Sequence, residues 1–180
     1  MFPDQPKKAN VLKKSDFGWF VSACNPDAPY EGLRVACYLT AWLFIWDDCW
    51  CPGGVREMYP LLTITGFEKS FLSAGAQETR DYVSETVNYI TECLLAEEAS
   101  QVPVSQDKLL AEFKRHVTDP LIHVCDTRRR GLFLKEMLVY IKAVEMEQYV
   151  HAKEEVVSLD EYWMYRASSG AVRVCLALNE

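Results

Sequence analysis

The stretch VACYLTAWLFIW, from Val35 to Trp46, decides the fold, because as a helix it is apolar on nearly every side. A helix of this composition is expected to be buried at the centre of a protein. We predict it over residues 33–50. The run is shorter than the roughly 20 apolar residues that a bilayer requires, and Thr40 interrupts it. The sequence therefore predicts a central helix and no membrane span.

Four further segments show the helical period, with apolar residues three or four positions apart, whereas strict alternation is scarce. The predicted helices cover residues 76–97, 107–118, 131–153 and a segment that begins at Ser158. Pro120 is expected to end or kink the third of these helices. The last begins with a capping box, in which Ser158 and Glu161 satisfy each other's free backbone donors. These patterns predict an all-α helical bundle.

Composition limits the classes of protein to consider. The chain has 180 residues, of which 49% are apolar, and we expect one domain over residues 1–180. The net charge of −7 argues against a nucleic-acid partner. The basic cluster Arg128 to Arg130 is expected to be solvated surface. The seven cysteines are irregularly spaced, and Met1 to Lys14 has no apolar signal region, so we expect free thiols in a soluble, cytoplasmic protein.

Asp47 and Asp48 directly follow the apolar run. Buried carboxylates need a partner, and a hard divalent cation such as Mg²⁺ is one. Leu43 and Phe44 lie one turn earlier on the same side of the helix, which places an apolar wall beneath a candidate metal site. The alternative is that the two acids mark the point where the helix emerges into water. Spacing alone leaves both interpretations open.

A second candidate site is the segment YRASSG, from Tyr165 to Gly170. Arg166 lies one turn before a glycine that should break the helix, and an apolar segment, Ala171 to Leu178, then begins again. An arginine beside a helix break can bind a phosphate together with freed backbone groups. The alternative is an exposed arginine next to a glycine kink.

Taken together, these features resemble the class I terpene synthases of microbes and fungi, especially the sesquiterpene cyclases, over about residues 33–178. The resemblance implies the class I terpenoid synthase bundle and a lyase of secondary metabolism. It implies that Asp47 and Asp48 bind Mg²⁺ and that Arg166 senses the diphosphate of the substrate. It also implies that Ser169 and Gly170 act as linker and effector of the helix break that triggers ionisation.

The implied reaction is ionisation of an isoprenoid diphosphate, with farnesyl diphosphate as the expected substrate and a sesquiterpene as the product. Magnesium and Arg166 would neutralise the diphosphate leaving group. The carbocation would then fold against an apolar wall, for which Phe44, with Leu43 behind it, is the candidate. Asp47, Arg166 and Gly170 are thus the predicted catalytic residues, and Ser169, Phe44 and Leu43 are predicted to contact the substrate.

The sequence departs from the family pattern in three places. The third acid of the aspartate motif is replaced by Cys51, and a thiol is a poor magnesium ligand. The second metal motif of the family is expected beyond Gly170 but does not occur before Glu180, which predicts an incomplete, carboxy-terminally truncated bundle. Residues 49–75 have no clean period, and a loop or a gene-model artefact would both account for them.

Two rival functions stay open at this stage. An inactive cyclase-like fragment would bind a partner, or associate with itself, through apolar faces that a shortened bundle leaves exposed. A prenyl chain-elongating enzyme uses similar acids but normally carries two aspartate-rich motifs, and the sequence has one.

Overall fold

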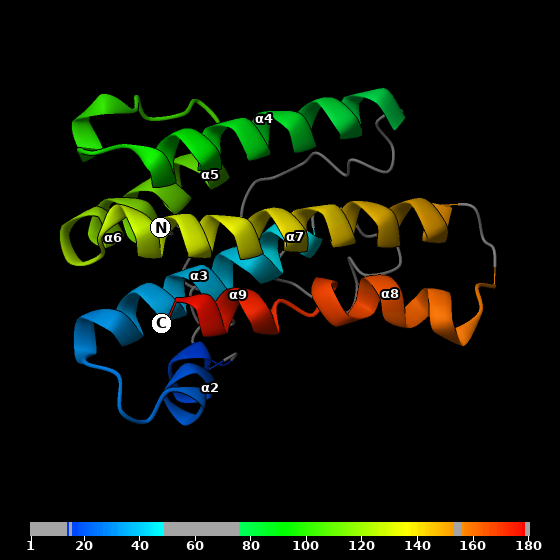
Figure 1. The fold of residues 1–180 in the computed structure, drawn as a ribbon, viewed down its shortest axis with the longest axis horizontal. Coiled ribbons are helices and arrows are strands. Elements are labelled where there is room, and N and C mark those ends of the chain that lie inside the picture. Colours follow the sequence, from blue (N-terminus) through cyan, green and yellow to red (C-terminus); the bar gives the residue numbers. More distant parts are fainter. Residues whose placement is uncertain (1–13, 15, 49–75, 153–155, 179–180) are drawn as a thin grey trace. The chain divides into compact units, whose positions relative to one another are not determined.

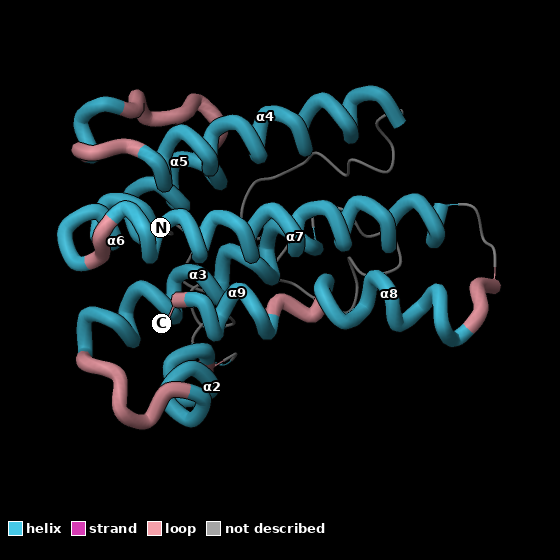
Figure 2. Tube along the Cα trace, in the orientation of Figure 1, coloured by secondary structure: helices cyan, strands magenta, loops and turns pink. Residues whose placement is uncertain are grey.

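The computed structural model describes residues 14, 16–48, 76–152 and 156–178. Regular structure in these residues is helical throughout, without strands, which confirms the all-α prediction (Figure 2). None of the described helices is sufficiently long and apolar to cross a membrane. The chain divides into two compact units, Met1–Arg80 and Asp81–Glu180, and each is described by itself. Residues 49–75, which the sequence left as a loop or an artefact, lie outside the described part.

Two packed helices, α2 (Phe17–Cys24) and α3 (Tyr30–Asp48), make up most of the described part of the first unit. Asp16 caps α2, because its carboxylate accepts a hydrogen bond from the backbone N–H of Trp19 at 3.2 Å. The Cys37 thiol donates to the Phe17 carbonyl at 3.8 Å and so joins the two helices. The apolar period did not predict α2, since this helix has only two turns and a single buried residue, Val21.

Helix α3 is the predicted apolar helix, and it begins one turn earlier than expected. Most of its apolar side chains are buried, as the sequence predicted, and Leu39 and Trp46 are fully enclosed. Trp42 and Trp46 lie one turn apart with stacked rings, whose centroids are 5.9 Å apart. The buried face of α3 therefore continues to the residue directly before Asp47.

The described part of the second unit contains both long and short helices (Figure 1). Helix α7 (Thr127–Ala152) packs against α8 (Leu159–Ser169) and α9 (Val172–Ala177). Helix α4 (Ala76–Leu95) begins in the first unit, and a short 3₁₀ turn, η2 (Ala99–Gln101), follows it. The predicted capping box is confirmed at the start of α8: Glu161 N–H donates to Ser158 Oγ at 3.3 Å, and Ser158 N–H donates to Glu161 Oε2 at 2.9 Å.

Of the two outcomes expected at Pro120, an end or a kink of the third predicted helix, the end is not observed. Helix α5 (Lys108–Phe113) continues through a π-helical turn, η3 (Lys114–Thr118), into α6 (Asp119–Val124). Pro120 is the second residue of α6, a position where its missing N–H and fixed φ are tolerated. The helical backbone thus passes through the proline, because a wider π turn precedes it.

The expectation for the arginine cluster is wrong at one position. Arg128 and Arg129 are exposed, but Arg130 is buried. Its guanidinium donates to the carbonyls of Leu94, Ala96 and Cys125 at 3.0, 2.8 and 2.8 Å. The first two carbonyls lie at the end of α4, where helical carbonyls have no partner within the helix. Arg130, which lies on α7, therefore supplies hydrogen-bond donors to the free carbonyls at the end of α4.

A second buried cation, Lys114, lies in the π turn. Its ammonium donates to the Ala99 carbonyl at 2.9 Å and to Asp119 Oδ1 at 2.7 Å. Cys93 lies in a small buried cluster with Ala96 and Val102, and burial raises the pKa of its thiol to about 11. The five cysteines in the described residues are free thiols, in line with the expectation from their spacing.

Candidate functional site

The predicted metal site lies at the last turn of α3. Asp47 is half-buried and directly follows the enclosed Trp46. Asp48 ends the helix, and its side chain is outside the described part, as is Cys51. Two carboxylates at a helix C-terminus oppose the helix dipole, so helix stability does not explain them. Binding of a cation by these two acids stays a prediction.

The predicted apolar wall has one buried and one exposed member. Leu43 is buried, whereas 54% of the surface of Phe44 is exposed. The Phe44 ring packs against Phe17 of α2, with centroids 5.6 Å apart. Phe44 thus retains one accessible face, which a ligand could contact.

The predicted diphosphate sensor, Arg166, lies in the last turn of α8. Its Nη1 donates to Glu147 Oε1 of α7 at 3.4 Å, and 44% of the arginine side chain is exposed, against 15% of the glutamate. Tyr165 beside it is buried; desolvation raises the pKa of its hydroxyl, and the Glu147 carboxylate adds to the shift. Sequence patterns did not assign a role to Glu147, because it lies nineteen residues from Arg166 and meets it only when α7 and α8 pair.

Ser169, the predicted linker, is the last residue of α8. Its hydroxyl is buried and has no hydrogen-bond partner among the described residues, and the same holds for Oε1 of Gln148 on α7. Leaving a buried polar group unpaired costs about 1–3 kcal/mol. A protein can carry such a cost at a site for a polar ligand, because the bound ligand supplies the missing hydrogen bond.

The predicted helix break is present between α8 and α9, in residues 168–172, called the α8–α9 junction below. Gly170 is the C-cap of α8 and keeps a right-handed conformation, with φ −69°. Ala171 takes the left-handed conformation, with φ 58°. A Cβ atom added at Gly170 would lie 3.5 Å from the Arg166 carbonyl oxygen, an ordinary contact. The backbone strain of the junction is therefore at Ala171, one residue after the glycine.

A family model described as terpene synthase family 2, C-terminal metal binding, matches residues 38–180. The chain belongs to this terpene synthase family. The matched range contains the acids that end α3 and the whole α8–α9 junction, the two regions whose motifs suggested the family. Searches of curated proteins and of solved structures found no match.

The family model that matches this chain describes a C-terminal metal-binding region, so membership of the family implies use of a divalent metal. Within residues 14, 16–48, 76–152 and 156–178, so far as their side chains are described, no three His, Cys, Asp or Glu side chains are grouped to hold a metal ion. Asp47 is the one member of the predicted ligand pair whose side chain is described. The described residues thus do not assemble a ligand set, and the metal enters below as a proposal only.

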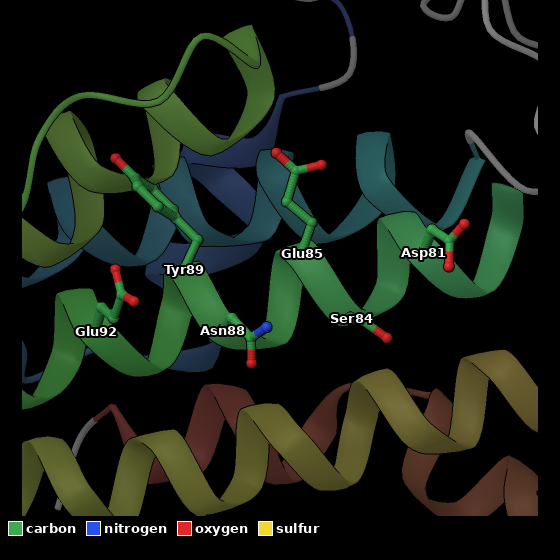
Figure 3. A pocket seen from close by; sticks show the side chains of 6 residues that line it. All are labelled: Asp81, Ser84, Glu85, Asn88, Tyr89 and Glu92. Atoms are coloured by element: carbon green, nitrogen blue, oxygen red, sulfur yellow. The ribbon is translucent and has the colours of Figure 1, made fainter.

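A hollow of about 460 Å³ lies along α4, on the second unit (Figure 3). It is lined by Asp81, Ser84, Glu85, Asn88, Tyr89 and Glu92. Tyr89 has a structural role there, since its hydroxyl donates to the Pro103 carbonyl and accepts from Ser105 N–H. The remaining lining includes three acids, Asp81, Glu85 and Glu92, which would repel a diphosphate. The hollow is therefore a poor candidate for the substrate site.

Replacing Ala171 by glycine is expected to stabilise the protein by about 0.5–1 kcal/mol. Glycine removes the roughly 1–2 kcal/mol cost of the left-handed conformation. The greater conformational entropy of the unfolded glycine variant offsets part of this gain. Urea unfolding measures the change. The matched control is Ala167→Gly within α8, which should instead destabilise by about 0.5–1 kcal/mol. Equal losses in both variants would contradict strain at Ala171.

Proposed function

We propose that this protein is a class I terpene synthase that ionises an isoprenoid diphosphate and cyclises the resulting carbocation. The observation that carries the proposal is the α8–α9 junction. There a half-exposed arginine and a buried, unpaired hydroxyl, Arg166 and Ser169, lie in the last turn before a strained helix break. The family match over residues 38–180 supports the same conclusion.

Arg166 suits the diphosphate group for chemical reasons. Its guanidinium is always charged and presents a planar fork of donors to phosphate oxygens. Cleavage of the carbon–oxygen bond leaves both electrons on the diphosphate, and a fixed positive charge lowers the energy of that step. No protein nucleophile is required. Ser169 and Gly170 lie three and four residues after Arg166, about one helical turn away, so a shift of this arginine toward the anion would move the helix break.

Magnesium is the proposed cofactor, with Asp47 and Asp48 as its proposed ligands; when bound, it would add positive charge at the diphosphate. The proposed apolar wall is formed by Phe44 and Leu43. An aromatic face stabilises a cation through its quadrupole, and the accessible face of Phe44 is suited to this contact. Exclusion of water would protect the carbocation from quenching.

The experiment is incubation of the purified protein with farnesyl diphosphate and Mg²⁺, with volatile products followed by gas chromatography and released diphosphate by a coupled assay. Geranyl and geranylgeranyl diphosphate, tested alongside, define the chain length. A cyclic hydrocarbon or terpene alcohol that disappears on chelation with EDTA is the expected product. Release of diphosphate without any terpene would contradict cyclisation.

The Asp47→Asn variant is expected to lower the rate of product formation by about 10- to 100-fold, because a metal ligand loses its charge. The loss should be partly recovered at higher Mg²⁺ concentration. Asp27→Asn, which alters an exposed acid outside the helices of the same unit, is the matched control and should change the rate little. Equal rates for Asp47→Asn and Asp27→Asn would refute the metal role.

A second function, self-association without catalysis, is favoured by one observation. Several large apolar side chains on α8 and α9 are exposed: Leu159, Trp163, Met164, Val172 and Leu176. Exposed apolar patches often mark contact surfaces. Folded protein that forms concentration-dependent oligomers and gives no product from any of the three diphosphates would support this function instead of the enzyme.

A further inference from the structure

Two arginines, one on each side of the α8–α9 junction, are tied to α7 in different ways. Arg173 of α9 contacts Glu136 with two nitrogens, Nη2 at 2.9 Å and Nε at 2.8 Å. Arg166 of α8 contacts Glu147 with a single nitrogen at 3.4 Å. The first pair combines a hydrogen bond from Nη2 to Oε1 with a close ionic contact between Nε and Oε2, and the second is a single, longer contact. The Arg166–Glu147 pair is therefore the one that can exchange its partner easily.

The burial of the two partners differs as well. The Glu147 carboxylate is largely enclosed, whereas nearly half of the Arg166 side chain is open to solvent. A guanidinium has five N–H donors, and one of them is used in this contact. Arg166 can thus reach an incoming anion, while Glu147 stays in place on α7.

We infer that Glu147 is the resting partner of Arg166 and competes with the diphosphate for its guanidinium, so that Glu147 sets the affinity of the site. Glu147 is a positioning residue, since it acts through Arg166 and not on the substrate. The inference rests on the proposed role of Arg166 as the diphosphate-binding group. Because Arg166 must leave the Glu147 carboxylate before it binds the diphosphate, the affinity for the diphosphate is lower by the free energy of the broken contact.

The test measures binding of inorganic diphosphate with Mg²⁺ by isothermal titration calorimetry in the full chain. Glu147→Gln, which keeps the shape but removes the charge, is expected to tighten binding roughly three- to tenfold. Glu136→Gln removes the equivalent carboxylate from the Arg173 pair on the same helix, and it should change the affinity by less than about twofold, since Arg166 keeps its partner. Glu147→Asp, which retains the charge, should remain closer to the wild type than Glu147→Gln.

The decisive comparison is made in an Arg166→Gln background. There the gain from Glu147→Gln should disappear, because Glu147 acts through Arg166. A gain that persists in this background would overturn the inference, as would unchanged or weaker binding in Glu147→Gln when wild-type binding depends on Arg166. If neither the wild type nor Glu147→Gln binds diphosphate in an Arg166-dependent way, the proposed role of Arg166 fails and the inference fails with it.

Discussion

Replacing Arg166 by alanine is expected to lower the rate of diphosphate release from the isoprenoid substrate by about 100- to 1,000-fold. The loss corresponds to removal of one preorganised charge from a leaving group that develops negative charge as the bond breaks. Single-turnover kinetics with farnesyl diphosphate measure the bond-breaking step directly. Arg166→Lys should recover only part of the rate, since an ammonium keeps the charge but not the planar fork.

Arg173→Ala is the matched control for this variant. It removes the same type of side chain from the other side of the α8–α9 junction and breaks the ion pair with Glu136. Both variants lose one ion pair to α7, so both should show similar small changes in thermal stability. Only Arg166→Ala should lose the chemical step. Equal loss of activity in the two variants would mean that the junction matters for folding alone and that Arg166 has no special role.

Replacing Arg130 by methionine is expected to destabilise the protein by about 3–5 kcal/mol, which in a chain of this size is a large share of total stability. Methionine retains the apolar stem but leaves the carbonyls of Leu94, Ala96 and Cys125 without their donor. Each buried, unpaired carbonyl carries its own desolvation cost. Urea unfolding followed by circular dichroism measures the change.

Arg128→Met tests whether the effect comes from burial of the charge or from the cluster as a whole. Arg128 lies on the same turn of α7 but is exposed, so its replacement should change the free energy of unfolding by less than about 0.5 kcal/mol. A large loss in Arg128→Met, or a small one in Arg130→Met, would show that the carbonyls at the end of α4 do not depend on Arg130.

Most of the helices could be predicted because their signals are local. The apolar run that became α3, the stripe of apolar residues along α4 and the capping box of α8 each lie within one or a few helical turns. Helix α2 was missed because two turns with one buried residue give almost no period. The sequence left open whether Pro120 ends or kinks the third helix, because proline is also tolerated at the second position of a helix.

By itself, the sequence determined the helical class, the approximate positions of the long helices and the two motifs that led to the terpene synthase family. These depend on the spacing of residue types along the chain, which is preserved in any packing of the helices. Only the tertiary structure decided that Arg130 is buried at the end of α4, that Glu147 holds Arg166 and that Ala171 bears the strain of the helix break. The first two contacts join residues 34 and 19 positions apart, so they arise only when helices pack. The third depends on how the chain turns at a junction fixed by α7 on both sides, where the conformation follows from packing and not from the preference of the residue itself.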